Sequence, residues 1–204
     1  RLSLKDIDIK GDYSVGGLVG IGDVKVAANQ NQENIGNNIG NCHVTGKVTA
    51  TNTDDSKNGN GAYAGGLIGF NNGDENKKIY ASVLSSIDKS TANVEVRADA
   101  NYAGGFAGGN FGNITACKAF GSVKGKKSVG GLVGGNQGGI YNSCSYGNVK
   151  GEEDVGGFIG HNFGDYKNNG AVCVLAVTGF IGHNFGDYKN HLVVLLVRLI
   201  VLSV

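Results

Sequence analysis

The chain has 204 residues, of which 18 are basic and 17 acidic, giving a formal net charge of +1. No basic block stands out, which argues against nucleic acid as a partner. Glycine accounts for 37 residues and proline for none, a composition that excludes collagen and indicates many tight turns.

One short motif recurs along the chain: a small or apolar residue, two glycines, two apolar residues and a further glycine. Its clearest copies, Ala103–Gly108, Val129–Gly134 and Val155–Gly160, are each followed by Asn-x-Gly. The glycine pairs beginning at 104, 130 and 156 are 26 residues apart. A fixed period of this length indicates one structural unit, here called a coil, that stacks on copies of itself. Related segments stand at Val15–Gly20, Ala64–Gly69 and Thr178–Gly182.

Each coil also carries an isoleucine, with glycine seven and valine nine places later, as at Ile114, Gly121 and Val123. The apolar runs have the length of strands rather than helices. One coil cannot bury an apolar face alone, so we expect successive coils to pair in parallel about 4.8 Å apart. We therefore predict an all-β parallel β-solenoid (β-helix) of about six coils, with the right-handed sense that parallel connections favour. A β-propeller is the alternative, although its blades need about 40 residues.

Stacking predicts columns of equivalent residues. Leu132 should lie between Phe106 and Phe158 in the core. A column of small, inward residues is expected three places after each isoleucine, at Cys42, Ser82, Cys117 and Ser143. Asparagines should form a ladder at one corner, since their amides both donate and accept along a stack. Its members are Asn71, Asn110, Asn136, Asn162 and Asn184.

The first two coils are longer than the period, and we place their extra residues in polar surface loops. In the first coil these lie at about 22–36 and 50–61, and in the second at about 74–78 and 87–99. Solenoid loops often carry recognition, whereas the alternative is a solvated loop without a partner. The candidate contact residues are Asn52, Thr53, Asp54, Asp55, Ser56 and Lys57.

The C-terminal region departs from the period. Residues 157–168 and 179–190 are identical and only 22 residues apart, which indicates a recent duplication or a sequence error. Leu192–Leu202 contains no glycine, is shorter than the about 20 residues of a membrane span and is interrupted by Arg198. We divide the chain into a solenoid domain, 1–190, and an apolar C-terminal strand or cap, 191–204, through which rods could associate end to end.

No catalytic, cofactor or metal residue is predicted. The expected register sets Cys42 and Cys117 two coils apart and offsets Cys117 from Cys144 by one place, so we expect free thiols. His161 and His183 occupy equivalent positions and could share a metal if stacked. Other coils hold Phe70, Gly109 and Gly135 there, so we interpret the position as a variable one without a metal.

The repeated Val-Gly-Gly-Leu-Val-Gly, Asn-x-Gly and Ile-x-x-Cys-x-x-x-Gly-x-Val segments resemble the GLUG-motif repeat over about residues 13–165. That family occurs in bacterial surface and secreted proteins, including adhesin-like proteins and the N-terminal regions of immunoglobulin A1 metallopeptidases. The resemblance implies an extracellular or cell-surface location. It transfers no catalytic residue, because the His-Glu-x-x-His motif of the peptidase activity is missing from this sequence.

Three functions follow as hypotheses. The first is a non-enzymatic module for adhesion, or a rigid spacer, whose partner is a host or matrix protein or a glycan. The second is the repeat region of a larger secreted metallopeptidase of the immunoglobulin A1 protease type. The third is a carbohydrate-binding or polysaccharide-degrading β-helix, which would require a cluster of carboxylates on the stacked strands.

Overall fold

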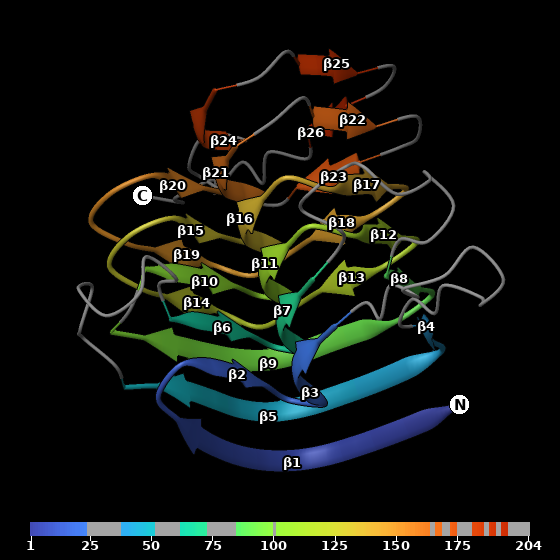
Figure 1. Ribbon diagram of the computed structural model, residues 1–204, viewed down its shortest axis with the longest axis vertical. Helices are drawn as coiled ribbons and strands as arrows, with labels where there is room; N and C mark the ends of the chain where they lie inside the picture. Colours follow the sequence, from blue (N-terminus) through green and yellow to red (C-terminus); the bar gives the residue numbers. More distant parts are fainter. Residues whose placement is uncertain are drawn as a thin grey trace, which may run out of the picture.

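The computed structural model describes residues 1–23, 38–51, 62–72, 85–99 and 101–163, with short stretches at 166–168, 172–174, 181–185, 188–190 and 193–195. All the elements within these ranges are β-strands. Successive turns of chain lie on top of one another, and their strands pair in parallel (Figure 1). The predicted parallel β-solenoid is thereby confirmed, while its handedness stays a prediction. Among the described residues, no helix is long and apolar enough to cross a membrane.

Four sheets form the sides of the stack, numbered here in the order in which the chain enters them. Sheet 1 contains β2 (Ser14–Gly16), β6 (Tyr63–Gly65), β10 (Tyr102–Gly104), β15 (Val129–Gly130) and β20 (Val155–Gly156). Sheet 2 contains β3 (Val19–Gly22), β7 (Ile68–Asn71), β11 (Ala107–Asn110), β16 (Val133–Asn136), β21 (Ile159–Asn162) and β24 (Ile181–Asn184). Sheet 3 contains β4 (Asn38–Gly40), β8 (Ser86–Asp88), β12 (Asn113–Thr115) and β17 (Gly139–Tyr141). The pair β22 (Tyr166–Asn168) and β25 (Tyr188–Asn190) continues the stack beside β17.

Sheet 4 contains the longest strands of the first coils. It comprises β1 (Leu2–Gly11), β5 (Cys42–Ala50), β9 (Thr91–Ala98), β13 (Lys118–Ala119), β18 (Cys144–Ser145), β23 (Val172–Val174) and β26 (Val193–Leu195), with β14 (Val123–Lys124) and β19 (Val149–Lys150). In the later coils this side is split into two short strands at Gly121 and Gly147. A Cβ on Gly121 would lie 1.9 Å from Val94 O, so the chain bends inward where only glycine fits.

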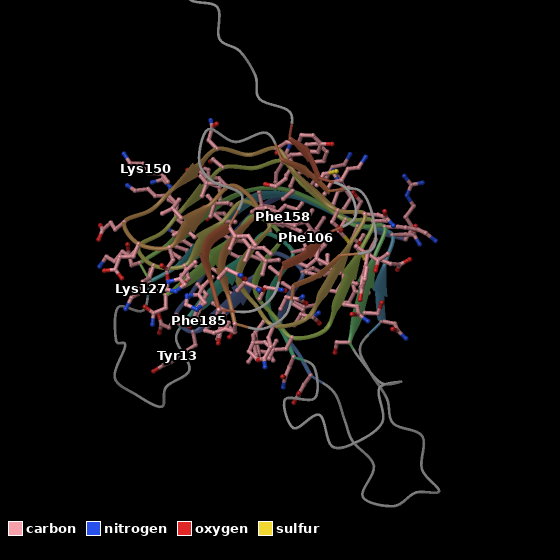
Figure 2. All side chains as sticks on the ribbon, turned by 90° about the horizontal axis from the view of Figure 1, so that it is seen from above. Tyr13, Phe106, Lys127, Lys150, Phe158 and Phe185 are labelled. Atoms are coloured by element: carbon pink, nitrogen blue, oxygen red, sulfur yellow. The ribbon has the colours of Figure 1, made fainter. Side chains whose placement is uncertain are left out.

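The core is one continuous column of apolar side chains. Phe106 N donates to Leu132 O over 2.9 Å, and Leu132 N donates to Phe158 O over 2.9 Å. All three side chains are fully buried, and both phenylalanines lie inside the ring of strands (Figure 2). Leu132 therefore lies between Phe106 and Phe158, as the 26-residue period predicts.

The two glycines of each repeat have different functions. A Cβ on Gly104 would lie 1.9 Å from Ala107 O, three residues on, so the first glycine permits the tight turn from sheet 1 to sheet 2. A Cβ on Gly105 would lie 2.3 Å from Gly131 O of the next coil, so the second glycine permits close stacking. The pair thus sets both the path of each coil and the approach of its neighbour.

The asparagine ladder is confirmed at the end of the sheet 2 strands. Each Nδ2 donates to the Oδ1 of the next coil: Asn71 to Asn110 (2.8 Å), Asn110 to Asn136 (2.9 Å), Asn136 to Asn162 (3.0 Å) and Asn162 to Asn184 (2.8 Å). The Nδ2 atoms of Asn110 and Asn136 also donate to Gly112 O and Gly138 O. At the start of the ladder the Oδ1 of Asn71 has no hydrogen-bond partner, because its register neighbour is Gly22.

The predicted alignment of the second coil is wrong. Ile87, rather than Ile79, faces Ile39 and Ile114. The segment 87–99 is therefore no insertion but regular strand, and almost all the extra residues of this coil fall between Asn72 and Ser85. The expected insertions of the first coil agree with the register, although 24–37 and 52–61 lie outside the described residues.

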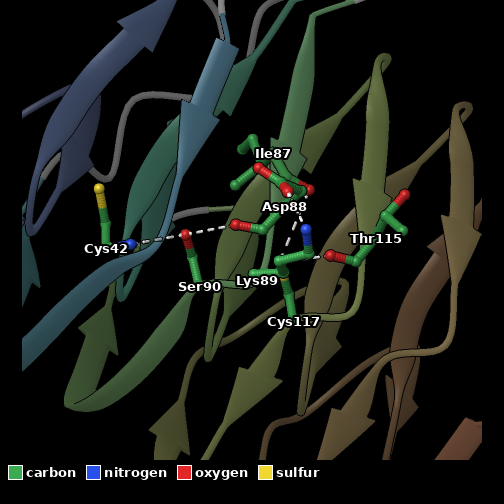
Figure 3. A network of polar contacts seen from close by, with 7 residues as sticks. All are labelled: Cys42, Ile87, Asp88, Lys89, Ser90, Thr115 and Cys117. Atoms are coloured by element: carbon green, nitrogen blue, oxygen red, sulfur yellow. Dashed lines mark hydrogen bonds and ion pairs between the residues drawn. The ribbon is translucent and has the colours of Figure 1, made fainter. Parts of the chain in front are cut away.

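Small residues do hold the corner between sheets 3 and 4, with Ser90 in the place predicted for Ser82, which lies outside the described residues. Ser90 Oγ accepts a hydrogen bond from Cys42 N (3.0 Å) and donates one to Asp88 O (2.8 Å; Figure 3). Ser143 Oγ likewise accepts from Cys117 N (3.1 Å). The preceding residues take φ values of +45° to +54°, so the small side chain stabilises a sharp corner.

The expectation of free thiols is confirmed for Cys42 and Cys117 and wrong for Cys144, which is disulfide-bonded. The predicted offset holds, since Lys118 rather than Cys117 faces Cys144. Sequence reasoning did not consider that the shorter last repeat brings Cys173 into register with Cys144. Neighbouring parallel strands are about 4.8 Å apart, within the range that a disulfide can span.

The duplicated C-terminal segments stack on each other. Ile159 faces Ile181, and Tyr166 faces Tyr188, so the 22-residue spacing still closes one turn of the solenoid. Beyond them, β26 adds to sheet 4 beside β23. The division at residue 190 and the end-to-end association stay predictions, and residues 196–204 lie outside the described residues.

Candidate functional site

An aromatic column runs along the outer face where sheets 1 and 2 meet. It is made by outward residues just before and after the ladder asparagines, together with tyrosines of sheet 1. Tyr63 stacks on Tyr102 (ring centroids 4.9 Å apart) and contacts Phe70 (4.6 Å), while Tyr102 contacts Phe163 (5.8 Å). The column comprises Tyr63, Phe70, Tyr102, Phe111, His161, Phe163, His183 and Phe185.

Glycines in the variable position make room for these rings. A Cβ on Gly109 would lie 2.7 Å from Tyr63 Cε1, and one on Gly135 would lie 2.8 Å from Tyr102 Cδ1. The tyrosine of one coil therefore lies over the glycine of the next. The variation at this position follows a packing rule, since large and absent side chains alternate between adjacent columns.

Two histidines and one aspartate form a cluster in this column. His161 Nδ1 is 2.9 Å from Asp154 Oδ2, and His183 Nδ1 is 3.3 Å from Asp154 Oδ1. The two imidazoles stack with centroids 4.8 Å apart and planes 25° apart. Their side chains are 13% and 45% exposed, and that of Asp154 is 26% exposed. The cluster therefore lies at the surface with one side open to solvent.

The backbone explains why these three residues meet. His161 and His183 face each other in the parallel register of β21 and β24. Asp154 directly precedes β20 and has φ of +50°, which is uncommon for a residue other than glycine. The tight Gly156-Gly157 turn then folds β21 back beside Asp154. Sequence reasoning aligned the two histidines but did not identify the aspartate, which lies in a different column.

The charge of Asp154 is stabilised by its neighbours. Burial alone would raise the pKa of this carboxyl, but hydrogen bonds from His161 and His183 and their positive charge outweigh burial. The net result is a pKa below the ordinary value. The carboxylate is therefore ionised at neutral pH, with both oxygens directed at imidazole nitrogens.

A second hollow, of about 380 Å³, lies at the other end of the stack. Cys42 and His43 are neighbours in β5, but successive side chains of a strand point to opposite faces, so they do not form a nucleophile and base pair. The Cys42 thiol donates to Gly40 O (3.4 Å), and His43 Nδ1 bonds to Thr91 Oγ1. The hollow is lined by Arg1, Asn41, Cys42, His43, Lys89 and Thr91.

The predicted contact residues Asn52, Thr53, Asp54, Asp55, Ser56 and Lys57 lie outside the described residues, so their role stays a prediction. Comparison with known proteins bears on the repeat itself. Residues 99–124, one full period, match the family model described as the GLUG motif. The chain carries the GLUG motif.

The GLUG chain is also similar to a solved structure. This is the 1.30 Å crystal structure of a putative immunoglobulin A1 protease from Bacteroides ovatus, with a TM-score of 0.64 and 22% sequence identity. The alignment covers 92% of this chain and 59% of that one, so the GLUG chain spans less than two thirds of that structure. At this identity the likeness establishes the fold. The search of curated proteins gave no match.

Proposed function

We propose that this chain is a non-catalytic repeat region of a larger secreted or surface protein of the immunoglobulin A1 protease type. The observation that carries the proposal is the alignment of nearly the whole chain with part of a longer chain of that description. The GLUG motif at 99–124 supports the same placement. The disulfide at Cys144 favours an oxidising compartment, where such bonds persist.

The stack is suited to hold other parts of such a protein apart. Backbone bonds and the asparagine ladder join each coil to the next, so the repeat region resists bending more than a linker would. The described residues bring together no nucleophile with a base. We therefore assign the stack a spacer or presenting role, with proteolysis belonging to another part of the parent protein.

The test compares this chain with its parent protein on purified immunoglobulin A1. The chain alone should leave the antibody intact, whereas the parent should cleave it and should contain a His-Glu-x-x-His helix outside this region. Cleavage by the isolated chain would overturn the non-catalytic assignment. A parent without a peptidase domain would overturn the protease context.

Adhesion through the loop at 52–57 is the second candidate, favoured by the position of this long polar insertion beside the regular stack. Deleting residues 52–57 should reduce binding to host matrix while leaving the β-sheet circular dichroism unchanged. Unchanged binding would remove this loop as the contact.

A further inference from the structure

We propose that Asp154, His161 and His183 bind one divalent transition metal ion, zinc being the best match, on the outer face of the stack. The three residues each offer one ligand atom, and these atoms lie within 4.8 Å of one another. The inference does not depend on the protease context, because it rests on this cluster alone.

The spacing of the ligand atoms suits a small tetrahedral ion. Metal–ligand distances of about 2.0–2.1 Å place neighbouring tetrahedral ligands about 3.3 Å apart. The two nitrogen–oxygen distances, 2.9 Å to His161 and 3.3 Å to His183, are close to that value. A modest opening of the cluster would therefore admit the ion.

The chemistry of the donors also selects the ion. Two imidazoles with one carboxylate form a set typical of zinc, whereas magnesium and calcium prefer oxygen ligands alone. Without metal, each Nδ1 carries a proton donated to Asp154. A divalent ion would replace those two protons and use the same nitrogen lone pairs. The exposed side of His183 leaves room for water as a fourth ligand.

The two columns that build the cluster change together at this place. The register aligns Asp154 with Tyr63, Tyr102 and Ser128 of the earlier coils. It aligns the histidines with Phe70, Gly109 and Gly135. Where the earlier coils pair tyrosine rings with glycines, this coil pairs a carboxylate with imidazoles. The earlier expectation of a variable position without metal is therefore revised.

His161 has further constraints that favour metal binding through Nδ1. Its Nε2 is buried and has no hydrogen-bond partner, so all the polar interactions of this ring lie on the Nδ1 side. Its ring is held against Phe163 (4.3 Å) and His183 (4.8 Å). The imidazole is thus fixed in position by packing before any ion arrives.

The test is zinc titration of the full chain by isothermal calorimetry, with variants His161→Gln, His183→Gln and Asp154→Asn. The wild type should bind one zinc ion per chain, and cobalt should give the visible absorption of a tetrahedral site. Each variant should weaken zinc binding by more than the about 10- to 100-fold typical of changes outside the ligand set. Circular dichroism checks that the variants fold.

His43→Gln is the matched control, since it removes a surface imidazole at the far end of the stack. It should bind zinc as the wild type does and show the same zinc-induced rise in unfolding temperature. The proposal is overturned if the wild type takes up no stoichiometric zinc, or if the three site variants retain it. It is equally overturned if His43→Gln loses as much affinity as they do.

Discussion

Replacing Asn136 with alanine removes a central member of the asparagine ladder. The substitution breaks three hydrogen bonds: the one accepted from Asn110, and those donated to Asn162 and to Gly138 O. Each such bond contributes about 1 kcal/mol net, and a buried polar atom left unpaired costs about 1–3 kcal/mol more. Because Asn162 Oδ1 then loses its donor in a fully buried side chain, we expect a loss of about 3–5 kcal/mol in the free energy of unfolding.

Two variants calibrate this figure. Gln137→Ala removes the same amide group from the adjacent, exposed position and should change stability by no more than about 0.5 kcal/mol. Asn71→Ala acts at the start of the ladder, where Oδ1 already has no partner, and should cost about 1–2 kcal/mol. All three variants are measured by urea unfolding with circular dichroism, since the chain lacks tryptophan.

The ordering of the three values decides the matter. The reasoning is refuted if Asn136→Ala costs no more than Gln137→Ala. It is also refuted if Asn71→Ala is as damaging as Asn136→Ala, because the number of ladder bonds would then not determine stability. A change in the urea dependence of the unfolding free energy would show instead that the variant alters the denatured state.

Two further predictions concern buried hydroxyls and thiols. Ser145→Ala should raise the unfolding temperature by about 2–4 °C, because its hydroxyl is buried without a hydrogen-bond partner. Ser143→Ala, two residues away, should lower stability by about 1–3 kcal/mol, because its hydroxyl holds Cys117 N; calorimetry measures both, and equal signs would contradict the reasoning. Burial raises the pKa of Cys117 from 9.0 to about 12, so iodoacetamide should label Cys42 well before Cys117. The same shift means that the unfolded chain loses this proton first, so Cys117 should reduce stability as pH rises from about 9 to 12, and a Cys117→Ser variant should lack that component.

The repetition of Gly-Gly and Asn-x-Gly was enough to predict the parallel stack and its columns. Equivalent positions 26 residues apart must become neighbours once coils stack, so the contact of Leu132 with Phe106 and the asparagine ladder could be predicted without coordinates. The second coil could not be aligned correctly, because two isoleucines, Ile79 and Ile87, both begin short apolar runs. Only strand pairing distinguishes them.

The candidate metal cluster was only half predictable. His161 and His183 are equivalent within the duplication, so their stacking could be expected. Asp154 lies outside the duplicated segment, and its contact arises across a turn between two sheets. Periodicity predicts neighbours along a column but not contacts between columns. The disulfide at Cys144 was missed because the last repeat is four residues shorter than the period, which changes which residues meet.

The hydrogen bonds of the asparagine ladder all point the same way, from each amide nitrogen to the oxygen of the following coil. A coil inserted anywhere in such a chain of amides brings one donor and one acceptor, and both are satisfied. The unsatisfied atoms are confined to the two extremities and do not increase with length. Copying a repeat therefore adds no polar penalty, and lineages carrying this stack are free to lengthen or shorten it, as the twin segments 157–168 and 179–190 illustrate.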